Sequence, residues 1–221
     1  MNIKQSITRG LTSLLLAGAL RATTNTALAE NNANMQYELN VISAPSSKFT
    51  LGRKAPINRI IIHSTEGAGE STLRWLTKDP RCQASAHYMI VENGKTYQMV
   101  NDKDTAWQAG KMANSSSLGI EVAGYANKPG FKFTDVQYTN TAKLALNLSK
   151  KYNIPKDNIV THDWVRRNLG GTLHTDPEPN FDWKRFNMIL NELNSERNTK
   201  LANSSRTNLY ANSTKRTAKI N

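Results

Sequence analysis

The stretch from Thr161 to Trp183 constrains this chain most, because it places metal-ligand side chains beside turn residues. His162 and His174, two of the four histidines of the chain, lie in it, and Asp176 follows His174 by two residues. Pro177 disfavours a helical conformation at Asp176 and favours an extended one. Since side chains two residues apart on an extended segment point to the same side, we expect His174 and Asp176 to face one cavity.

A second turn signal lies between the two histidines. Gly170-Gly171 can adopt backbone angles that other residues avoid, so the chain can fold back and bring His162 to the same cavity. Two imidazoles and a carboxylate that face one point can bind zinc or carry out acid–base chemistry. The stretch by itself leaves both roles open.

Residues 1–29 have the features of a secretory signal. Lys4 and Arg9 give a positive start, residues 11–20 form an apolar run too short to span a bilayer, and residues 27–29 form a small-x-small cleavage site. We therefore expect a secreted or cell-wall protein without a stable membrane span after signal cleavage. A retained N-terminal anchor is the alternative.

The chain is strongly basic, with a formal net charge of +12. The signal segment carries three of these positive charges and no acidic residue, so the remainder keeps +9. This charge favours an anionic partner such as a wall polymer or a phospholipid surface. Nucleic acid is not expected, because the protein is predicted to be exported and has no Arg-rich recognition helix. The single cysteine, Cys82, cannot form an internal disulfide.

Strand and helix signals alternate along the chain. Apolar or β-branched runs predict strands at residues 59–63, 86–91, 95–100, 118–122 and 159–161, and amphipathic or capped segments predict helices at 71–77, 134–152 and from Asp182 to about 193. Interspersed strands and helices predict an α/β fold with a mixed central β-sheet flanked by helices on both faces.

Changes in composition predict the domain boundaries. Residues 30–48 are polar and Asn-rich and are expected to form a leader, and residues 49–195 should form one catalytic domain. Residues 196–221 are basic and contain few apolar residues, so we expect a disordered tail. The tail is expected either to contact anionic wall polymers or to remain a solvated linker.

Five motifs occur in a recognisable order: the strand ending in His63, Ser85-Ala86-His87-Tyr88, Ala106-Trp107-Gln108-Ala109-Gly110, Leu118-Gly119-Ile120-Glu121, and His162 followed by His174-Thr175-Asp176-Pro177. This order resembles the zinc-dependent N-acetylmuramoyl-L-alanine amidases, the family that includes bacteriophage T7 lysozyme and the peptidoglycan recognition proteins. The resemblance covers about residues 49–193 and implies that fold. The Gly-Gly segment before His174 is closer to autolysin-type members than to muropeptide-recycling ones.

The resemblance implies a Zn²⁺ cofactor held by His63, His162 and Asp176. Two imidazoles and one carboxylate leave a fourth position open, as in catalytic zinc sites. It also implies that Glu121 is the catalytic carboxylate, because an acid set among apolar residues must be paired or face a cleft. His174 would stabilise the oxyanion, or else orient Asp176.

Three further residues are candidates for substrate contact: His87, Trp107 and Trp164. His87 has packing or hydrogen bonding as its alternative role, and it would replace any assigned ligand that proved wrong. Trp107 is also expected to suit the core. Gln108 departs from the histidine that the family more often has at this position, which weakens any assignment of a substrate-binding imidazole there.

The implied function is an exported peptidoglycan hydrolase. It would cleave the amide between N-acetylmuramic acid and L-alanine of the stem peptide with zinc-activated water, acting as a monomer on peptidoglycan. The alternatives are a non-catalytic peptidoglycan-binding module and a cytoplasmic recycling amidase, the second of which the signal segment disfavours.

Overall fold

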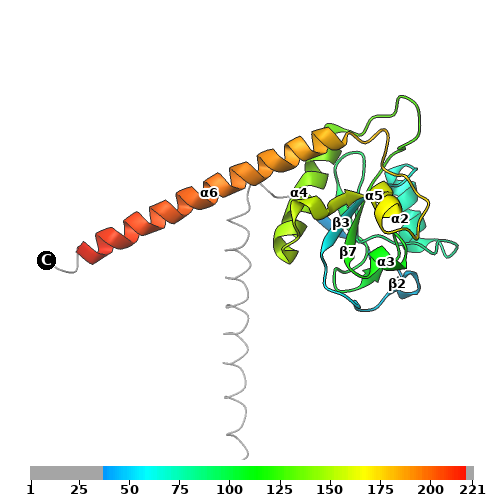
Figure 1. Cartoon of the computed structure of the whole chain (residues 1–221), viewed down its shortest axis with the longest axis horizontal. Coiled ribbons are helices and arrows are strands. Elements are labelled where there is room, and N and C mark those ends of the chain that lie inside the picture. Colours follow the sequence, from blue (N-terminus) through cyan, green and yellow to red (C-terminus); the bar gives the residue numbers. More distant parts are fainter. Residues whose placement is uncertain (1–36, 218–221) are drawn as a thin grey trace, which may run out of the picture. The chain divides into compact units, whose positions relative to one another are not determined.

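A six-stranded mixed sheet forms the centre of the fold (Figure 1). The structure, a computed structural model, describes residues 37–217, with side chains described for 37–205. The expected signal segment at residues 1–29 lies outside the described residues. In spatial order the strands are β1 (Leu39–Val41), β5 (Thr96–Gln98), β4 (Tyr88–Ile90), β7 (Ser117–Val122), β3 (Arg59–Ser64) and β8 (Ile159–Thr161). Strands β4, β7, β3 and β8 run parallel, whereas β5 is antiparallel to β4 and parallel to β1.

The remaining elements surround this sheet. A second, two-stranded antiparallel sheet joins β2 (Phe49–Thr50) to β6 (Thr105–Ala106). The helices are α2 (Gly69–Lys78), α3 (Lys111–Asn114), α4 (Asp135–Tyr152), α5 (His162–Asn168) and α6 (Trp183–Thr217), with short 3-10 turns η2 (Ser46–Lys48) and η3 (Lys156–Asn158). The predicted strands at 59–63 and 118–122 correspond to β3 and β7, and the predicted helix at 134–152 corresponds to α4.

Strand β3 lies in the interior of the sheet because its apolar run is buried on both faces. Ile60, Ile61 and Ile62 are fully buried, as expected for a strand between parallel neighbours with helices on either side. The parallel register places Ile62 next to Ile120 of β7 and next to Thr161 of β8. The residues that follow, at the carboxyl ends of these strands, are therefore neighbours too.

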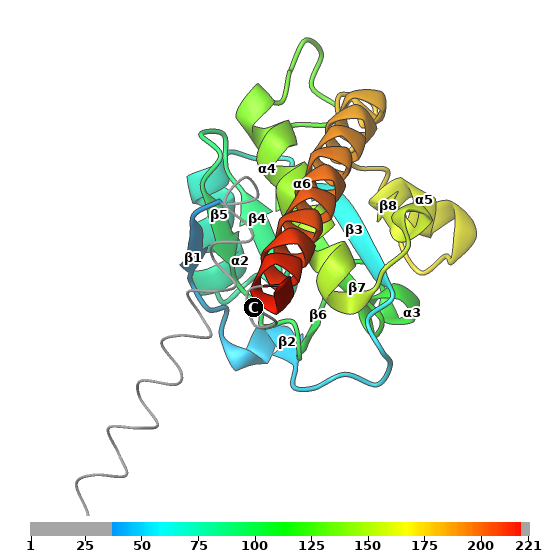
Figure 2. The ribbon, with the colours of Figure 1, turned by 90° about the vertical axis from the view of Figure 1, so that its left-hand side faces the viewer.

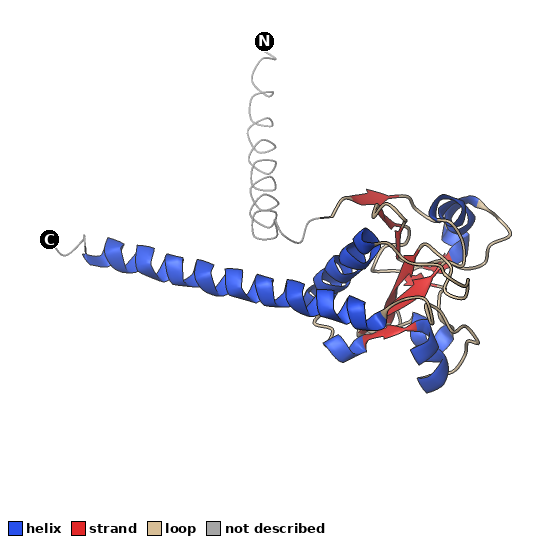
Figure 3. Ribbon diagram, turned by 90° about the horizontal axis from the view of Figure 1, so that it is seen from above, coloured by secondary structure: helices blue, strands red, loops and turns tan. Residues whose placement is uncertain are grey.

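Helices cover both faces of the sheet, which confirms the predicted fold class (Figures 2 and 3). On the face that bears Ile61, Val165 of α5 packs with Ile61, and Leu76 of α2 packs with Met89. Helix α4 contacts β3, β4 and β7, and α6 packs against α4. Thr134 caps helix α4, as predicted, and forms a capping box with Gln137.

The structure corrects the expected start of the domain. Residues 30–48 were expected to form a leader, yet β1 pairs with β5 and Lys48 is almost completely buried. The Lys48 ammonium donates hydrogen bonds to the carbonyl oxygens of Trp75, Leu76 and Asp79, at 2.9, 3.1 and 2.7 Å. These carbonyls end α2 and have no partner within the helix, so a buried cation is stabilised there.

The structure also corrects the expected tail. The final helix was expected to end near residue 193 and residues 196–221 to be disordered, but α6 continues to Thr217. No glycine or proline interrupts residues 183–217, so the helical backbone can continue without an apolar face. The residues from 198 to 205 are all exposed. No helix among the described residues is both long enough and apolar enough to cross a bilayer.

Candidate metal and catalytic site

Three polar side chains meet at the carboxyl ends of adjacent parallel strands. His63 on β3 is the register partner of Glu121 on β7, and both point to the face that Ile61 shares. Thr161 of β8 is the partner of Ile62, so His162 follows beside His63. In open sheets with helices on both faces, ligands bind at this edge. The fold therefore brings the first two predicted zinc ligands and the predicted catalytic carboxylate together.

Asp176, in the turn that follows α5, lies against His63 and His162. We call these three side chains the donor cluster. Its Oδ1 lies 3.0 Å from Nδ1 of His162, and its Oδ2 lies 3.4 Å from Nδ1 of His63. The two Nδ1 atoms are 3.0 Å apart. The backbone N–H of Ser64 donates to Asp176 Oδ2 at 3.1 Å, and the backbone N–H of Asp163 donates to its carbonyl oxygen. All three predicted ligands are buried.

The spacing of these donors suits zinc. In a tetrahedral site with ligand distances of about 2.0–2.1 Å, neighbouring donor atoms are roughly 3.3–3.4 Å apart. The separations among Nδ1, Nδ1 and Oδ are 3.0, 3.0 and 3.4 Å, within about 0.3 Å of that spacing. Burial tends to raise the pKa of Asp176, but hydrogen bonds from His162 and His63 outweigh it and hold the pKa below the ordinary range. A carboxylate kept ionised beside two imidazoles is the donor set of a catalytic zinc site.

Glu121 lies beside the cluster and is poorly solvated. Its Oε2 is buried and has no hydrogen-bond partner among the described residues. Burial, together with the negative charge of Asp176, raises the pKa of Glu121 to about 8. A carboxyl group tuned toward neutral pH can take up and release a proton during turnover.

His174 approaches from the loop that contains Gly170 and Gly171, both of which have positive φ angles. Its exposed ring stacks on the ring of His162, with centroids 5.3 Å apart. The hydroxyl of Thr172 lies 3.0 Å from Nε2 of His162. The loop therefore brings His174 to the cluster without making it part of the donor set.

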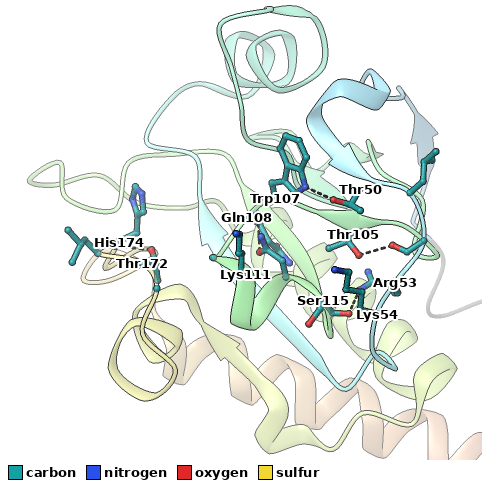
Figure 4. Close-up of a pocket in the computed structure, with 16 residues that line it drawn as sticks. Thr50, Arg53, Lys54, Thr105, Trp107, Gln108, Lys111, Ser115, Thr172 and His174 are labelled. Atoms are coloured by element: carbon teal, nitrogen blue, oxygen red, sulfur yellow. Dashed lines mark hydrogen bonds between the residues drawn. The ribbon is translucent and has the colours of Figure 1, made fainter.

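A cleft of about 1060 Å³ borders the cluster (Figure 4). We call it the main cleft; its lining includes Arg53, Lys54, Trp107, Gln108, Lys111 and His174. The indole N–H of Trp107 donates to the hydroxyl of Thr50 at 2.9 Å, and the residue is only partly buried. Trp107 thus lies where a bound ligand would contact it.

The structure corrects the expectation that His87 contacts substrate. The side chain is completely buried, its Nδ1 accepts from the backbone N–H of Gly119, and its Nε2 lies 3.2 Å from the carbonyl oxygen of Asp104. Burial and the positive charge of Arg53 lower the pKa of His87 to about 3. His87 is a neutral packing residue, and it is not in the donor cluster.

Trp164 also differs from expectation. It was expected to line the substrate cleft, but its ring stacks against the guanidinium of Arg59, 5.0 Å away, and packs beside Val165 and Ile61. It lines a separate cleft of about 450 Å³ that Trp183 shares. The cause is the short helix α5, which was not predicted and which turns Trp164 away from His162.

One functional contact was missed from the sequence. Gln108 had been noted only for its departure from the family pattern, yet its Oε1 lies 3.1 Å from Nε2 of His63. A ligand histidine usually donates its second N–H to a fixed acceptor. The motif Ala-Trp-Gln-Ala-Gly was the signal that could have identified this acceptor.

The comparison with known proteins agrees with this geometry. A family model described as N-acetylmuramoyl-L-alanine amidase matches residues 53–179, more than half of the chain. The 1,6-anhydro-N-acetylmuramyl-L-alanine amidase AmpD of Haemophilus influenzae is 36% identical over 112 residues, which make up 47% of this chain and 57% of that protein. The chain thus spans little more than half the length of this curated relative.

Two solved structures share the fold. A crystal structure of a selenomethionine AmpD derivative superposes with a TM-score of 0.58 at 25% identity, covering 70% of this chain and 96% of that one. Escherichia coli AmiD, solved with anhydro-N-acetylmuramic acid-L-Ala-D-gamma-Glu-L-Lys, gives a TM-score of 0.50 at 26% identity, covering 62% and 59%. With the expected motifs gathered at one sheet edge and the family model spanning them, this chain belongs to the N-acetylmuramoyl-L-alanine amidase family.

Proposed function

We propose that this protein is an exported, zinc-dependent hydrolase that cleaves the amide bond between N-acetylmuramic acid and L-alanine of peptidoglycan. The observation that carries the proposal is the meeting of His63, His162 and Asp176 beside Glu121 at the border of the main cleft. Family membership and the named activities of the relatives support the same bond.

The chain's own residues divide the chemistry among them. His63, His162 and Asp176 would hold zinc, which when bound supplies a Lewis acid for the amide carbonyl and lowers the pKa of water. Glu121 takes a proton from the attacking water as the water oxygen bonds to the carbonyl carbon. It then delivers that proton to the alanine nitrogen as the carbon–nitrogen bond breaks. The ring N–H of His174 donates to the carbonyl oxygen as negative charge develops there.

Export and the wall as the site of action are further parts of the proposal. They are supported by the signal-like residues 1–29 and by the charge of +9 on the remaining chain, which suits an anionic wall. The basic C-terminal segment of α6 would add contacts to anionic wall polymers. Cell fractionation tests this part by itself, because a protein found only in the cytoplasm would contradict export and leave the activity standing.

Digestion of purified cell walls tests the activity. The expected result is new alanine amino termini without new reducing sugar ends, abolished by a chelator and restored by zinc. The Glu121→Gln variant is the matched control, since it should bind walls and zinc without exposing new alanine amino termini. Reducing ends alone would identify a glycosidase, whereas wall binding without any cleavage would identify a binding module, and either result overturns the proposal.

A further inference from the structure

The main cleft has charge of one sign. Its lining includes Arg53, Lys54 and Lys111, and none of the described residues that line it is acidic. Figure 4 shows Lys111 beside Gln108, the residue whose Oε1 lies 3.1 Å from Nε2 of His63, and shows Lys54 beside Arg53 and Ser115. A cleft lined by one sign of charge concentrates ligands of the opposite sign.

The charge of Arg53 is committed to the fold. Its guanidinium donates to the carbonyl oxygens of Ser117, at 3.0 Å, and of Asp102. The carboxylates of Asp102 and Asp104 lie close enough to act on it electrostatically. Arg53 therefore has a structural role in the lining of the main cleft, and the carboxylates of Asp102 and Asp104 partly neutralise its charge.

Lys54 and Lys111 are different, because both side chains are exposed. None of the ion pairs among the described residues involves either lysine. Two ammonium groups are thus available along the cleft. An anionic ligand that spans the cleft would meet both.

A stem peptide can supply such an anion. The ligand of the similar AmiD contains a D-gamma-glutamyl residue, and a γ-linked glutamate leaves its α-carboxyl free. Converting that carboxyl group to a carboxamide removes the charge and keeps the shape.

We propose that the main cleft selects muramyl peptides whose stems carry free carboxylates, with Lys54 and Lys111 as the specificity-determining residues. This inference rests on the proposed amidase function. In this inference, the positive charges of Lys54 and Lys111 in the cleft lining select the substrate. The donor cluster and Glu121 carry out the reaction.

A pair of synthetic muramyl tripeptides tests the inference. The two are identical except that the γ-linked glutamyl residue carries an α-carboxylate or an α-carboxamide. Their dissociation constants are measured by titration calorimetry on the full chain with zinc and Glu121→Gln, which prevents turnover. The same background then receives Lys54→Gln, Lys111→Gln or both, and Lys184→Gln on α6 serves as an exposed control outside the cleft.

We expect the carboxylate peptide to bind at least fivefold more tightly, with the preference shrinking as salt is added. Each cleft substitution should weaken the carboxylate peptide by about fivefold and the carboxamide peptide by less than twofold, whereas Lys184→Gln changes neither. Equal affinities for the two peptides, or a preference that survives the double substitution, would overturn the inference. Failure of the amidase function is distinguishable, because the chain with Glu121 intact would then produce no new alanine amino termini.

Discussion

The side-chain oxygen of Gln108 lies 3.1 Å from Nε2 of His63, on the side of the imidazole opposite the donor cluster. The amide orientation of Gln108 follows from its other end, where Nε2 donates to the hydroxyl of Ser117 at 3.0 Å, and that hydroxyl donates to the carbonyl oxygen of Ala113. An amide oxygen can only accept, so Nε2 of His63 carries a proton, and with a metal bound Nδ1 would be the unprotonated nitrogen that coordinates it. Gln108 is a positioning residue.

Replacing Gln108 by Ala should weaken zinc binding by about 10-fold or more, because the imidazole of His63 loses the acceptor that sets its tautomer and orientation. Competition with a chelating dye measures the zinc affinity, and circular dichroism checks that the fold is intact. Gln108→Glu keeps an acceptor oxygen and should retain most of the affinity. An unchanged zinc affinity in Gln108→Ala would show that His63 is oriented by its surroundings alone.

A glycine provides an independent route to the same contact. Gly119 on β7 leaves the space that Gln108 occupies, since a Cβ there would lie 1.3 Å from Gln108 Oε1. Gly119→Ala should therefore displace the carboxamide and weaken zinc binding to a similar extent, measured in the same assay. The two substitutions act through one contact, so combining them should add little.

Glu121 should make the metal-free protein less stable as pH rises. Its pKa is about 8 in the folded chain against about 4.5 for an unperturbed glutamate, so between these pH values the folded state binds more protons than the unfolded state. Stability from this group is complete below about pH 4.5 and is lost as pH rises through about 8. Glu121→Gln should thus be more stable than the parent above pH 8, by on the order of 5 kcal/mol, and similar to it at pH 4.

Urea unfolding with a chelator present, repeated across the pH range, measures this difference. Asp176 titrates in the opposite direction and is present in both proteins, so comparing the two isolates Glu121. A stability difference that does not vary with pH would mean that the pKa of Glu121 is not raised in the folded state. In that case, Oε2 would be hydrogen-bonded to water or to the protein.

His174→Ala should lower kcat by about 100-fold, because the carbonyl oxygen loses a hydrogen-bond donor that acts in the transition state. Zinc content should remain at one ion per chain, since His174 stacks on His162 and is not in the donor cluster. His174→Gln, which keeps an N–H, should recover part of the activity. Loss of zinc from His174→Ala would instead place this histidine among the ligands.

Lys48→Met should destabilise the domain by about 1.5–3 kcal/mol, because three carbonyl oxygens at the end of α2 lose a charged donor. The midpoint of urea unfolding measures the change. Lys103→Met, at an exposed lysine, is the matched control and should stay within about 0.5 kcal/mol of the parent. An equally small effect at Lys48 would mean that water replaces the ammonium at little cost.

Lys48 also illustrates which parts of the fold are readable from sequence. The apolar run Ile60–Ile62 predicts β3, and the parallel register then brings Glu121 next to His63, so local pattern and family order were enough for the donor cluster. Lysine normally indicates solvent exposure, and the three-residue strand β1 has no periodicity. The burial of Lys48 and the pairing of β1 depend on contacts with residues distant in the sequence. Such contacts cannot be predicted from the neighbouring residues.

His87 and Trp164, both named as candidates for substrate contact, lie outside the lining of the main cleft for a related reason. A histidine before a hairpin and a tryptophan two residues after a ligand both suggest proximity to substrate. Whether such a side chain faces a cleft or the core depends on its side-chain and backbone torsion angles, which are fixed by contacts with other parts of the chain. For His87 they are set by the backbone of Gly119 and by Arg53, and for Trp164 by the turn of α5.

Removing residues 198–221 should leave the domain intact and weaken its attachment to walls. The described residues 198–205 are exposed, so the free energy of unfolding should change by less than about 0.5 kcal/mol, and hydrolysis of a soluble muramyl peptide should be unchanged. The removed segment carries five cations and no acid. Co-sedimentation with walls should therefore fall, and the difference should vanish at high salt or on walls stripped of anionic polymers.

A full-length variant with those five cations changed to glutamine separates charge from length. If it sediments like the truncated chain, the charge of residues 198–221 accounts for the binding. If both variants sediment like the parent, the tail makes no contact with the wall, and retention there depends on the main cleft. That second outcome would make the affinity for walls follow Lys54 and Lys111, whose substitution should then lower sedimentation of the full chain by itself.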